Sequence, residues 1–306
     1  MNTLEKNYNL IIILGPTATG KTGLAAKLAS KFNGEIISAD SRQVYRGMDI
    51  GTGKDLADYT IDNVSVPYHL INIIDPDFEY NLFSFLSDFK NCFDDIISRQ
   101  KIPFLTGGTG LYLNSIIQKY KLKTALDDEV EAEYLTAKKH EELLLIYNKL
   151  NPSPHNTTDT SDKQRLIQAI LILKSKEEKS IDLTGINPFI IGVNLERDEI
   201  KKRITARLKK RLNEGMIEEV QQLVNRGISF DKLDFFGLEY RYLGLYLRGE
   251  LNYNDMYQKL NSAIHKFAKK QMTWFRKMER NGVEINWING PDYEAAERLM
   301  KSNFLV

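Results

Sequence analysis

Residues 15–22 of this chain are Gly15-Pro16-Thr17-Ala18-Thr19-Gly20-Lys21-Thr22, which match the phosphate-loop pattern G-x-x-x-x-G-K-[ST]. The apolar run Leu10–Leu14 just before them is typical of a buried parallel strand, and Thr22–Phe32 has the apolar spacing of a helix. A strand, a glycine-rich turn and a helix in this order are the context that the motif requires. The stretch therefore predicts a loop that binds a chain of phosphates.

All eight residues of this loop are candidate diphosphate-binding residues. Its glycines let backbone N–H groups turn toward phosphate oxygens, and the start of the helix adds partial positive charge. Lys21 adds a mobile point charge, and the hydroxyl of Thr22 is a candidate Mg²⁺ ligand. The pattern does not name the substrate. A diphosphate ester would satisfy it as well as a nucleotide, so a small-molecule kinase that uses ATP stays open as an alternative.

The rest of the chain predicts an α/β fold. Further buried strands are expected at Glu35–Ser38, Ile102–Leu105 and Phe189–Val193, with helical segments between them. Strands that alternate with helices indicate a parallel sheet covered on both faces. We therefore expect a P-loop NTPase-like core.

The alternation of strands and helices stops within residues 122–188. A charged helical segment over 127–148 and a second helix over 164–176 predict an all-helical insertion there. The core is then expected to comprise residues 1–121 and 189–306, and its C-terminal region is mostly helical.

The distribution of charge indicates a polyanionic partner. The formal net charge of the 306 residues is only +1, but residues 197–280 hold 19 Lys/Arg against 11 Asp/Glu, a local net of +8. A basic C-terminal third is typical of a surface that faces nucleic acid, although solvated helix faces can look the same.

The single cysteine and the hydropathy indicate a cytoplasmic protein. Cys92 alone excludes an intramolecular disulfide, which fits a reducing compartment. The run Leu10–Leu14 is too short for a signal peptide or a membrane span. Nothing in the sequence requires more than a monomer.

Asp40 follows the expected strand at Glu35–Ser38. In an open parallel sheet, ligands bind beyond the carboxyl ends of the strands, so Asp40 should face the ligand of the phosphate loop. Its carboxylate could act as a proton acceptor. The alternatives are a helix cap and an outer-shell ligand of Mg²⁺.

At this point the sequence resembles the tRNA dimethylallyltransferase (isopentenyltransferase) family. The phosphate loop and the segment Asp40–Gly53 carry most of the resemblance. It continues in family order through Pro67-Tyr68-His69-Leu70-Ile71, Gly107-Gly108-Thr109-Gly110-Leu111-Tyr112, Asp162-Lys163-Gln164-Arg165-Leu166 and Ala268-Lys269-Lys270-Gln271-Met272-Thr273-Trp274-Phe275. These blocks span almost the whole chain.

The resemblance implies that dimethylallyl diphosphate occupies the loop and that the N6 amine of adenine 37, beside the anticodon of tRNA, attacks its C1. Mg²⁺ is the implied cofactor. The implied catalytic residues are Asp40, Thr19 and Arg207, with Arg203 as a second candidate for the diphosphate. Because a stacked base cannot enter such a site, the adenine must be extruded from its loop.

The resemblance also implies a set of tRNA contacts. The expected residues are Asp40, Ser41, Arg42, Gln43, Thr109, Gln164, Arg165, Leu166, Ile167, Gln168, Lys269 and Lys270. A plain strand-to-helix turn is an equal alternative for Gly107–Gly110. The two lysines should follow tRNA phosphates, which position a nucleic acid without specifying its sequence.

Three other features bear on the site. Arg203, Arg207 and Arg211 recur every fourth residue and so form one stripe, for which a solvated face is the default interpretation. His69 is more typical of a structural strand histidine than of a catalytic base. The family usually has Asp where this chain has Asn72. A non-catalytic RNA-binding protein is the second alternative function.

Overall fold

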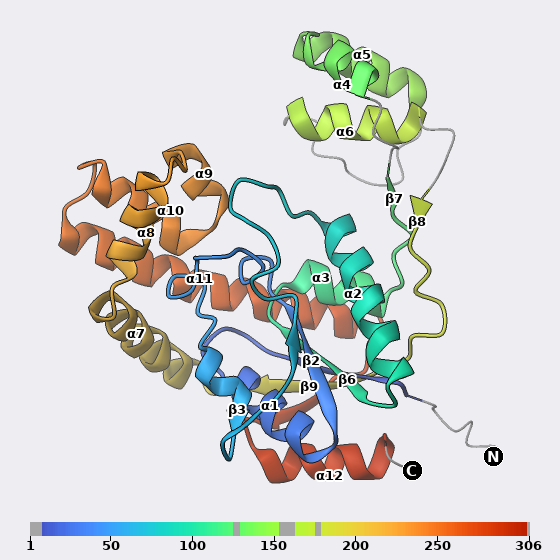
Figure 1. Cartoon of the computed structure of the whole chain (residues 1–306), viewed down its shortest axis with the longest axis vertical. Coiled ribbons are helices and arrows are strands. Elements are labelled where there is room, and N and C mark those ends of the chain that lie inside the picture. Colours follow the sequence, from blue (N-terminus) through green and yellow to red (C-terminus); the bar gives the residue numbers. More distant parts are fainter. Residues whose placement is uncertain (1–7, 125–128, 153–162, 175–178, 305–306) are drawn as a thin grey trace. The chain divides into compact units, whose positions relative to one another are not determined.

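The computed structural model of this chain describes residues 8–124, 129–152, 163–174 and 179–304 (Figure 1). The chain divides into two compact units, one formed by Met1–Lys119 with Leu183–Val306 and the other by Tyr120–Asp182. The smaller unit therefore begins two residues before, and ends six residues before, the range 122–188 expected from the sequence.

The larger unit is built on a six-stranded parallel sheet. Its order is β10-β9-β1-β6-β2-β5. The strands are β1 (Leu10–Leu14), β2 (Gly34–Ala39), β5 (Tyr68–His69), β6 (Ile102–Gly107), β9 (Pro188–Asn194) and β10 (Asn286–Asn289). Every residue of β1 and β2 is buried, as strands covered on both faces require, and β1 is apolar throughout. The predicted α/β fold, its four predicted core strands and the strand expected at His69 (β5) are confirmed, while β10 was not predicted.

Helices cover both faces of this sheet. The core around Ile11 and Ile13 of β1 includes residues of α1 (Lys21–Lys31) and α12 (Tyr293–Asn303). Figure 1 shows α2 (Leu82–Ser98) and α3 (Gly110–Ile117) on the other side. Cys92 lies half-buried within α2, and burial raises the pKa of its thiol to about 11.

The C-terminal region is helical, as predicted. It contains α7 (Arg197–Asn213), α8 (Met216–Asn225), α9 (Phe230–Phe235), α10 (Leu238–Leu247) and the long α11 (Tyr253–Arg280). The apolar stripe of α7 is buried, as is the stripe of α11 that holds Met256, Leu260 and Ile264. Between β2 and β5 the chain forms a 3₁₀ turn (Leu56–Tyr59) and a small hairpin, β3 (Thr60–Ile61) with β4 (Val64–Ser65).

The smaller unit holds α4 (Glu129–Thr136), α5 (His140–Leu150) and α6 (Lys163–Lys174), with the short antiparallel pair β7 (Lys123–Thr124) and β8 (Lys179–Ser180). The segment expected as one helix over 127–148 is therefore two helices. Leu166 and Ile167 of α6 are buried in the core of this unit. Their side chains cannot reach RNA, so the expected tRNA contacts are wrong for these two residues. The backbone of Gln164, Arg165 and Gln168 lies in α6, and their side chains lie outside the described structure.

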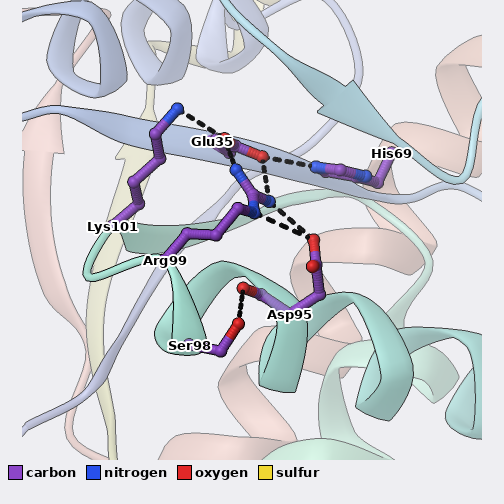
Figure 2. Close-up of polar contacts among 6 residues, drawn as sticks. All are labelled: Glu35, His69, Asp95, Ser98, Arg99 and Lys101. Carbon is purple, nitrogen blue, oxygen red and sulfur yellow. Dashed lines mark hydrogen bonds and ion pairs between the residues drawn. The ribbon is translucent and has the colours of Figure 1, made fainter.

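Near the amino end of β2, Glu35 lies at the centre of a cluster of charged side chains. Its side chain is only 2% exposed, and it accepts hydrogen bonds from Arg99, from Lys101 at 2.7 Å and from the ring of His69 at 2.8 Å (Figure 2). The Arg99 hydrogen bonds hold the pKa of Glu35 well below its usual range. His69 is thus a structural strand histidine, as expected. No described helix is long and apolar enough to cross a membrane.

Candidate active site

A cavity of about 630 Å³ lies in the larger unit, at the carboxyl ends of β1, β2 and β6. It is lined by most of the residues singled out from the sequence. The predicted residues that line it are Thr17, Ala18, Gly20, Lys21, Thr22, Asp40, Ser41, Arg42, Gln43, Thr109, Arg203, Arg207 and Lys270. Lys269 is exposed on α11 but does not line the cavity.

The phosphate loop has the expected shape between β1 and α1. Ala18 and Gly20 have positive φ angles, 66° and 83°, and the helix begins at Lys21. Gly15 has no room for a side chain, because a Cβ there would lie 2.3 Å from the carbonyl oxygen of Val193. The loop is therefore packed directly against β9, and its open side faces the cavity.

Thr19, one of the expected catalytic residues, has its side chain directed into the phosphate loop. It is fully buried, and its hydroxyl donates to the carbonyl of Pro16 at 2.9 Å. Gly15, Pro16 and Thr19 do not line the cavity. The Thr19 hydroxyl therefore stabilises the shape of the loop, and this bond gives no support to a direct catalytic role for that hydroxyl.

Positive charge is concentrated in the cavity. Burial, followed by the repulsion of Arg207, lowers the pKa of Lys21 to about 8. Burial, followed by the repulsion of Arg211, lowers the pKa of Arg207 to about 10. Charges that destabilise one another in a buried site are stabilised by an anion between them. An anion bound between Lys21 and Arg207 would therefore offset their mutual repulsion.

Of the three arginines of the α7 stripe, Arg207 is the best placed to bind that anion. Its guanidinium donates to the hydroxyl of Thr17 in the phosphate loop. Arg203 is already paired with Glu199 at 2.7 Å on its own helix. Arg211, which the sequence did not single out, is buried and bonds Asp55 at 3.1 Å. Arg207 and Arg211 of the stripe thus contact other parts of the protein, whereas the side chain of Arg203 is 41% exposed.

Asp40 lies at the end of β2 in a fixed turn. Its Oδ1 accepts the backbone N–H of Arg42 at 2.9 Å, whereas Oδ2 has no hydrogen-bond partner among the described residues. The neighbouring N–H of Ser41 donates to the hydroxyl of Thr109 at 3.3 Å. Asp40 caps none of the described helices. One carboxylate oxygen therefore fixes the side chain and leaves the other for a ligand.

Arg42 and Gln43 also have partners within the protein. The guanidinium of Arg42 lies 4.8 Å from the centroid of the Phe235 ring, in the geometry of a cation–π contact. The side-chain amide of Gln43 accepts from Ser38 at 3.1 Å and donates to the carbonyl of Gly53 at 3.0 Å. The two side chains line the cavity in defined orientations.

Two further residues hold the segment between Asp49 and Lys54. The carboxylate of Glu219 accepts the backbone N–H groups of Asp49, Ile50 and Gly51 at 2.7–2.9 Å. The side chain of Lys54 is 1% exposed and donates to Asp49, Asn72 and a backbone carbonyl. Asn72, at a position where the family usually has Asp, thus still accepts a hydrogen bond from this lysine.

Comparisons with known proteins identify the family. A family model described as IPP transferase matches residues 43–278, and one described as isopentenyl transferase matches residues 8–61. The chain is 50% identical over 299 residues to "tRNA dimethylallyltransferase 1" of Syntrophus aciditrophicus, covering 96% of this chain and 98% of that protein. This chain belongs to the tRNA dimethylallyltransferase family. It is also 50% identical over 306 residues to "tRNA dimethylallyltransferase 2" of Trichlorobacter lovleyi, covering 99% of each.

Solved structures of this family have the same fold. The crystal structure of a tRNA isopentenylpyrophosphate transferase from Bacillus halodurans matches with a TM-score of 0.68 and 32% identity, covering 97% of this chain and 95% of that one. A eukaryotic dimethylallyltransferase acting on tRNA matches with a TM-score of 0.71 at 23% identity, which bears on the fold alone. Membership of this prenyltransferase family does not favour the kinase alternative.

Proposed function

We propose that this chain transfers the dimethylallyl group of dimethylallyl diphosphate to N6 of adenine 37 in tRNA. The products are N6-isopentenyladenosine and diphosphate. The observation that carries the proposal is the convergence, in one cavity, of a phosphate loop, the half-buried cations Lys21 and Arg207, and the carboxylate of Asp40. Family membership supports the same reaction.

The cations act on the leaving group. When the bond between C1 and the diphosphate oxygen breaks, negative charge grows on the diphosphate. Lys21, Arg207 and the N–H groups of the loop are in place to stabilise that charge before the reaction begins. Arginine suits this task because its planar fork can bind two phosphate oxygens.

Asp40 acts on the nucleophile. The exocyclic amine of adenine is a weak nucleophile, because its lone pair is delocalised into the ring. As the bond between N6 and C1 forms, an N6 proton becomes acidic and passes to the carboxylate of Asp40. The free Oδ2 can accept this proton, while the hydrogen bond from Arg42 to Oδ1 keeps the side chain in place.

The protein oxygen atoms near the phosphate loop fit a magnesium ion that is bound mainly by the substrate. The described residues contain no group of three or more His, Cys, Asp or Glu side chains that could hold a metal ion by themselves. Mg²⁺ commonly binds through one or two protein oxygens, water and phosphate oxygens. The hydroxyl of Thr22 lines the cavity and would be the protein ligand. Bound there, Mg²⁺ would neutralise part of the diphosphate charge.

The proposed tRNA contacts lie on α11, in the helical unit and in the cavity. Lys269 and Lys270 are exposed on α11, and Lys270 also lines the cavity, so a tRNA whose adenine enters the cavity could place phosphates near them. The helical unit, with Gln164, Arg165 and Gln168 on α6, is proposed to contact the anticodon arm. Arg42 and Thr109 are proposed to contact the extruded base and its neighbours.

The experiment is transfer to two matched RNAs. The purified protein is incubated with dimethylallyl diphosphate and an anticodon stem-loop that has adenine at position 37, or the same stem-loop with guanine there. Digestion and mass spectrometry should find one dimethylallyl group on the adenine of the first RNA and none on the second. Equal modification of both RNAs, or of neither, would exclude the proposed acceptor.

A further inference from the structure

Gln271 of α11 joins the two turns on which the proposed chemistry depends. Its side chain is buried, at 5% exposure. Its Oε1 accepts the backbone N–H of Thr17 in the phosphate loop at 2.8 Å, and its Nε2 donates to the carbonyl of Gly108 at 2.9 Å. Thr17 follows β1 and Gly108 follows β6, and these two strands are neighbours in the sheet. One amide group therefore links two adjacent strand ends.

The packing around this link leaves little freedom. A Cβ on Gly108 would lie 2.2 Å from Nε2 of Gln271. A Cβ on Gly110 would lie 2.7 Å from Cγ of Trp274, one helical turn further along α11. The helix thus contacts the turn at two glycines, and a side chain at either position would displace Gln271 or Trp274. The position of Gln271 relative to Gly108 is fixed by direct contact.

Each partner of Gln271 leads to one side of the proposed reaction. The hydroxyl of Thr17 accepts a hydrogen bond from Arg207, which is proposed to bind the leaving diphosphate. Thr109, next to Gly108, accepts the N–H of Ser41, next to Asp40. A short path of hydrogen bonds and adjacent residues therefore runs from Arg207 to Asp40, and Gln271 lies in its middle.

We propose that Gln271 is a positioning residue that sets the spacing between the phosphate loop and Asp40. This inference rests on the proposed function. Gln271 acts through Thr17 and Gly108, whose backbone groups it holds. Only a side chain with both an acceptor and a donor can satisfy an N–H and a carbonyl together. Glutamate can only accept, methionine can do neither with comparable strength, and asparagine is one methylene too short to span the gap.

The test compares Gln271→Met, Gln271→Glu and Gln271→Asn with the wild type. Four quantities are measured: the single-turnover rate of prenyl transfer, the KM for dimethylallyl diphosphate, the Kd for tRNA and the melting temperature. Because a misplacement of about 1 Å can cost roughly 10²-fold in rate, Met and Glu should lower the transfer rate by about that factor. Their Kd for tRNA should stay within about twofold of the wild type. Asn, which keeps the amide, should fall between them and the wild type.

The matched control is Gln258→Met, which makes the same change at an exposed position on the same helix and should leave all four quantities unchanged. A wild-type transfer rate in Gln271→Met would overturn the proposal. So would parallel losses of rate, tRNA affinity and melting temperature in all three variants, since these would describe a merely structural residue. Failure of the proposed function is distinguishable, because the wild type itself would then transfer no dimethylallyl group.

Discussion

At the scale of single residues, Asp40 provides the clearest test of the chemistry. Asp40→Asn keeps an oxygen that can accept the N–H of Arg42, so the turn should be preserved while the proton acceptor is lost. The transfer rate should fall by roughly 10²–10⁴-fold, as expected for loss of a general base. Binding of tRNA, measured by filter retention, should change little.

Asp58→Asn is a suitable control, since Asp58 is a carboxylate that lines the same cavity. It should retain transfer within a few-fold of the wild type. If Asp40→Asn turned over at the wild-type rate, Asp40 would not be the proton acceptor.

Lys21 predicts a pH dependence of diphosphate binding. Burial and Arg207 lower its pKa to about 8 in the empty site. Above that pH the amine of Lys21 is mostly neutral, and binding of an anion requires it to take up a proton. The affinity for the anion should therefore fall as the pH rises through about 8. Calorimetry with inorganic pyrophosphate between pH 7 and 9 would show weaker binding and proton uptake at the alkaline end.

The ionisation of pyrophosphate itself changes over this range, so the comparison needs Lys21→Met. That variant shares the ionisation of the ligand but lacks the titrating side chain. The difference in pyrophosphate affinity between the wild type and Lys21→Met should therefore shrink above pH 8. A difference in affinity that stays constant with pH would show that Lys21 does not titrate there.

At the scale of secondary-structure elements, α7 and α11 should have separable functions. Arg207→Ala removes charge-assisted hydrogen bonds to the diphosphate, each worth about 1.5–3 kcal/mol, so pyrophosphate affinity should fall roughly tenfold or more. Its tRNA affinity should change less. Arg203→Ala, one turn earlier and paired with Glu199, should have a smaller effect. The reverse pattern would assign Arg207 to the RNA surface.

For α11, the prediction concerns salt. Replacement of both Lys269 and Lys270 by Ala should lower tRNA affinity and reduce the slope of its logarithm against log salt, by about 1 to 2 for two lost phosphate contacts. Lys27→Ala with Lys31→Ala is the matched control, because both are exposed lysines on one helix, α1. An unchanged salt slope in the α11 variant would mean that its lysines do not contact phosphates.

The elements of the site differ in how far the sequence could predict them. The phosphate loop, the strands around it and Asp40 were predictable, because each follows from a local pattern of apolar residues and turn residues. Strand β10 was missed, and β5 was anticipated only through His69, since four and two residues are too few to show a period. The sequence predicted one helical segment where the structure has α4 and α5, because the charged residues between the two helices do not interrupt an apolar pattern.

Contacts between distant segments account for most of the rest. Gln271 lies 254 residues from Thr17, and Glu219 lies 168 residues or more from the backbone groups that it binds. Nothing in the local sequence around Arg211 distinguishes it from Arg207 or indicates its hydrogen bond to Asp55. Such partners depend on how helices pack on the sheet, which no local pattern specifies. The burial of Leu166 and Ile167 in the smaller unit is of the same kind.

At the scale of the whole molecule, the cluster around Glu35 should contribute to stability in a pH-dependent way (Figure 2). A carboxyl whose pKa is lowered on folding stabilises the protein above its unfolded pKa and loses that contribution as the pH falls. The free energy of unfolding should therefore decrease from about pH 5 downward. Glu35→Gln should be less stable at pH 7 by about 1–3 kcal/mol and should show a weaker acid dependence.

Urea unfolding at several pH values checks this expectation. Asp95→Asn is the control, because Asp95 also bonds Arg99 but is exposed, so it should cost less than about 1 kcal/mol. Equal stability of Glu35→Gln and the wild type at pH 7 would mean that the ion pairs of Glu35 contribute nothing net.

The central claim is that the phosphate loop holds the diphosphate of a prenyl donor. Its most direct test is a reaction with unmodified tRNA and two donors in parallel, dimethylallyl diphosphate labelled in the prenyl group and ATP labelled in the γ-phosphate. We expect prenyl label in the RNA, with release of one diphosphate for each group transferred, and no label from ATP. Transfer of label from ATP alone, to the RNA or to a small molecule, would contradict the claim.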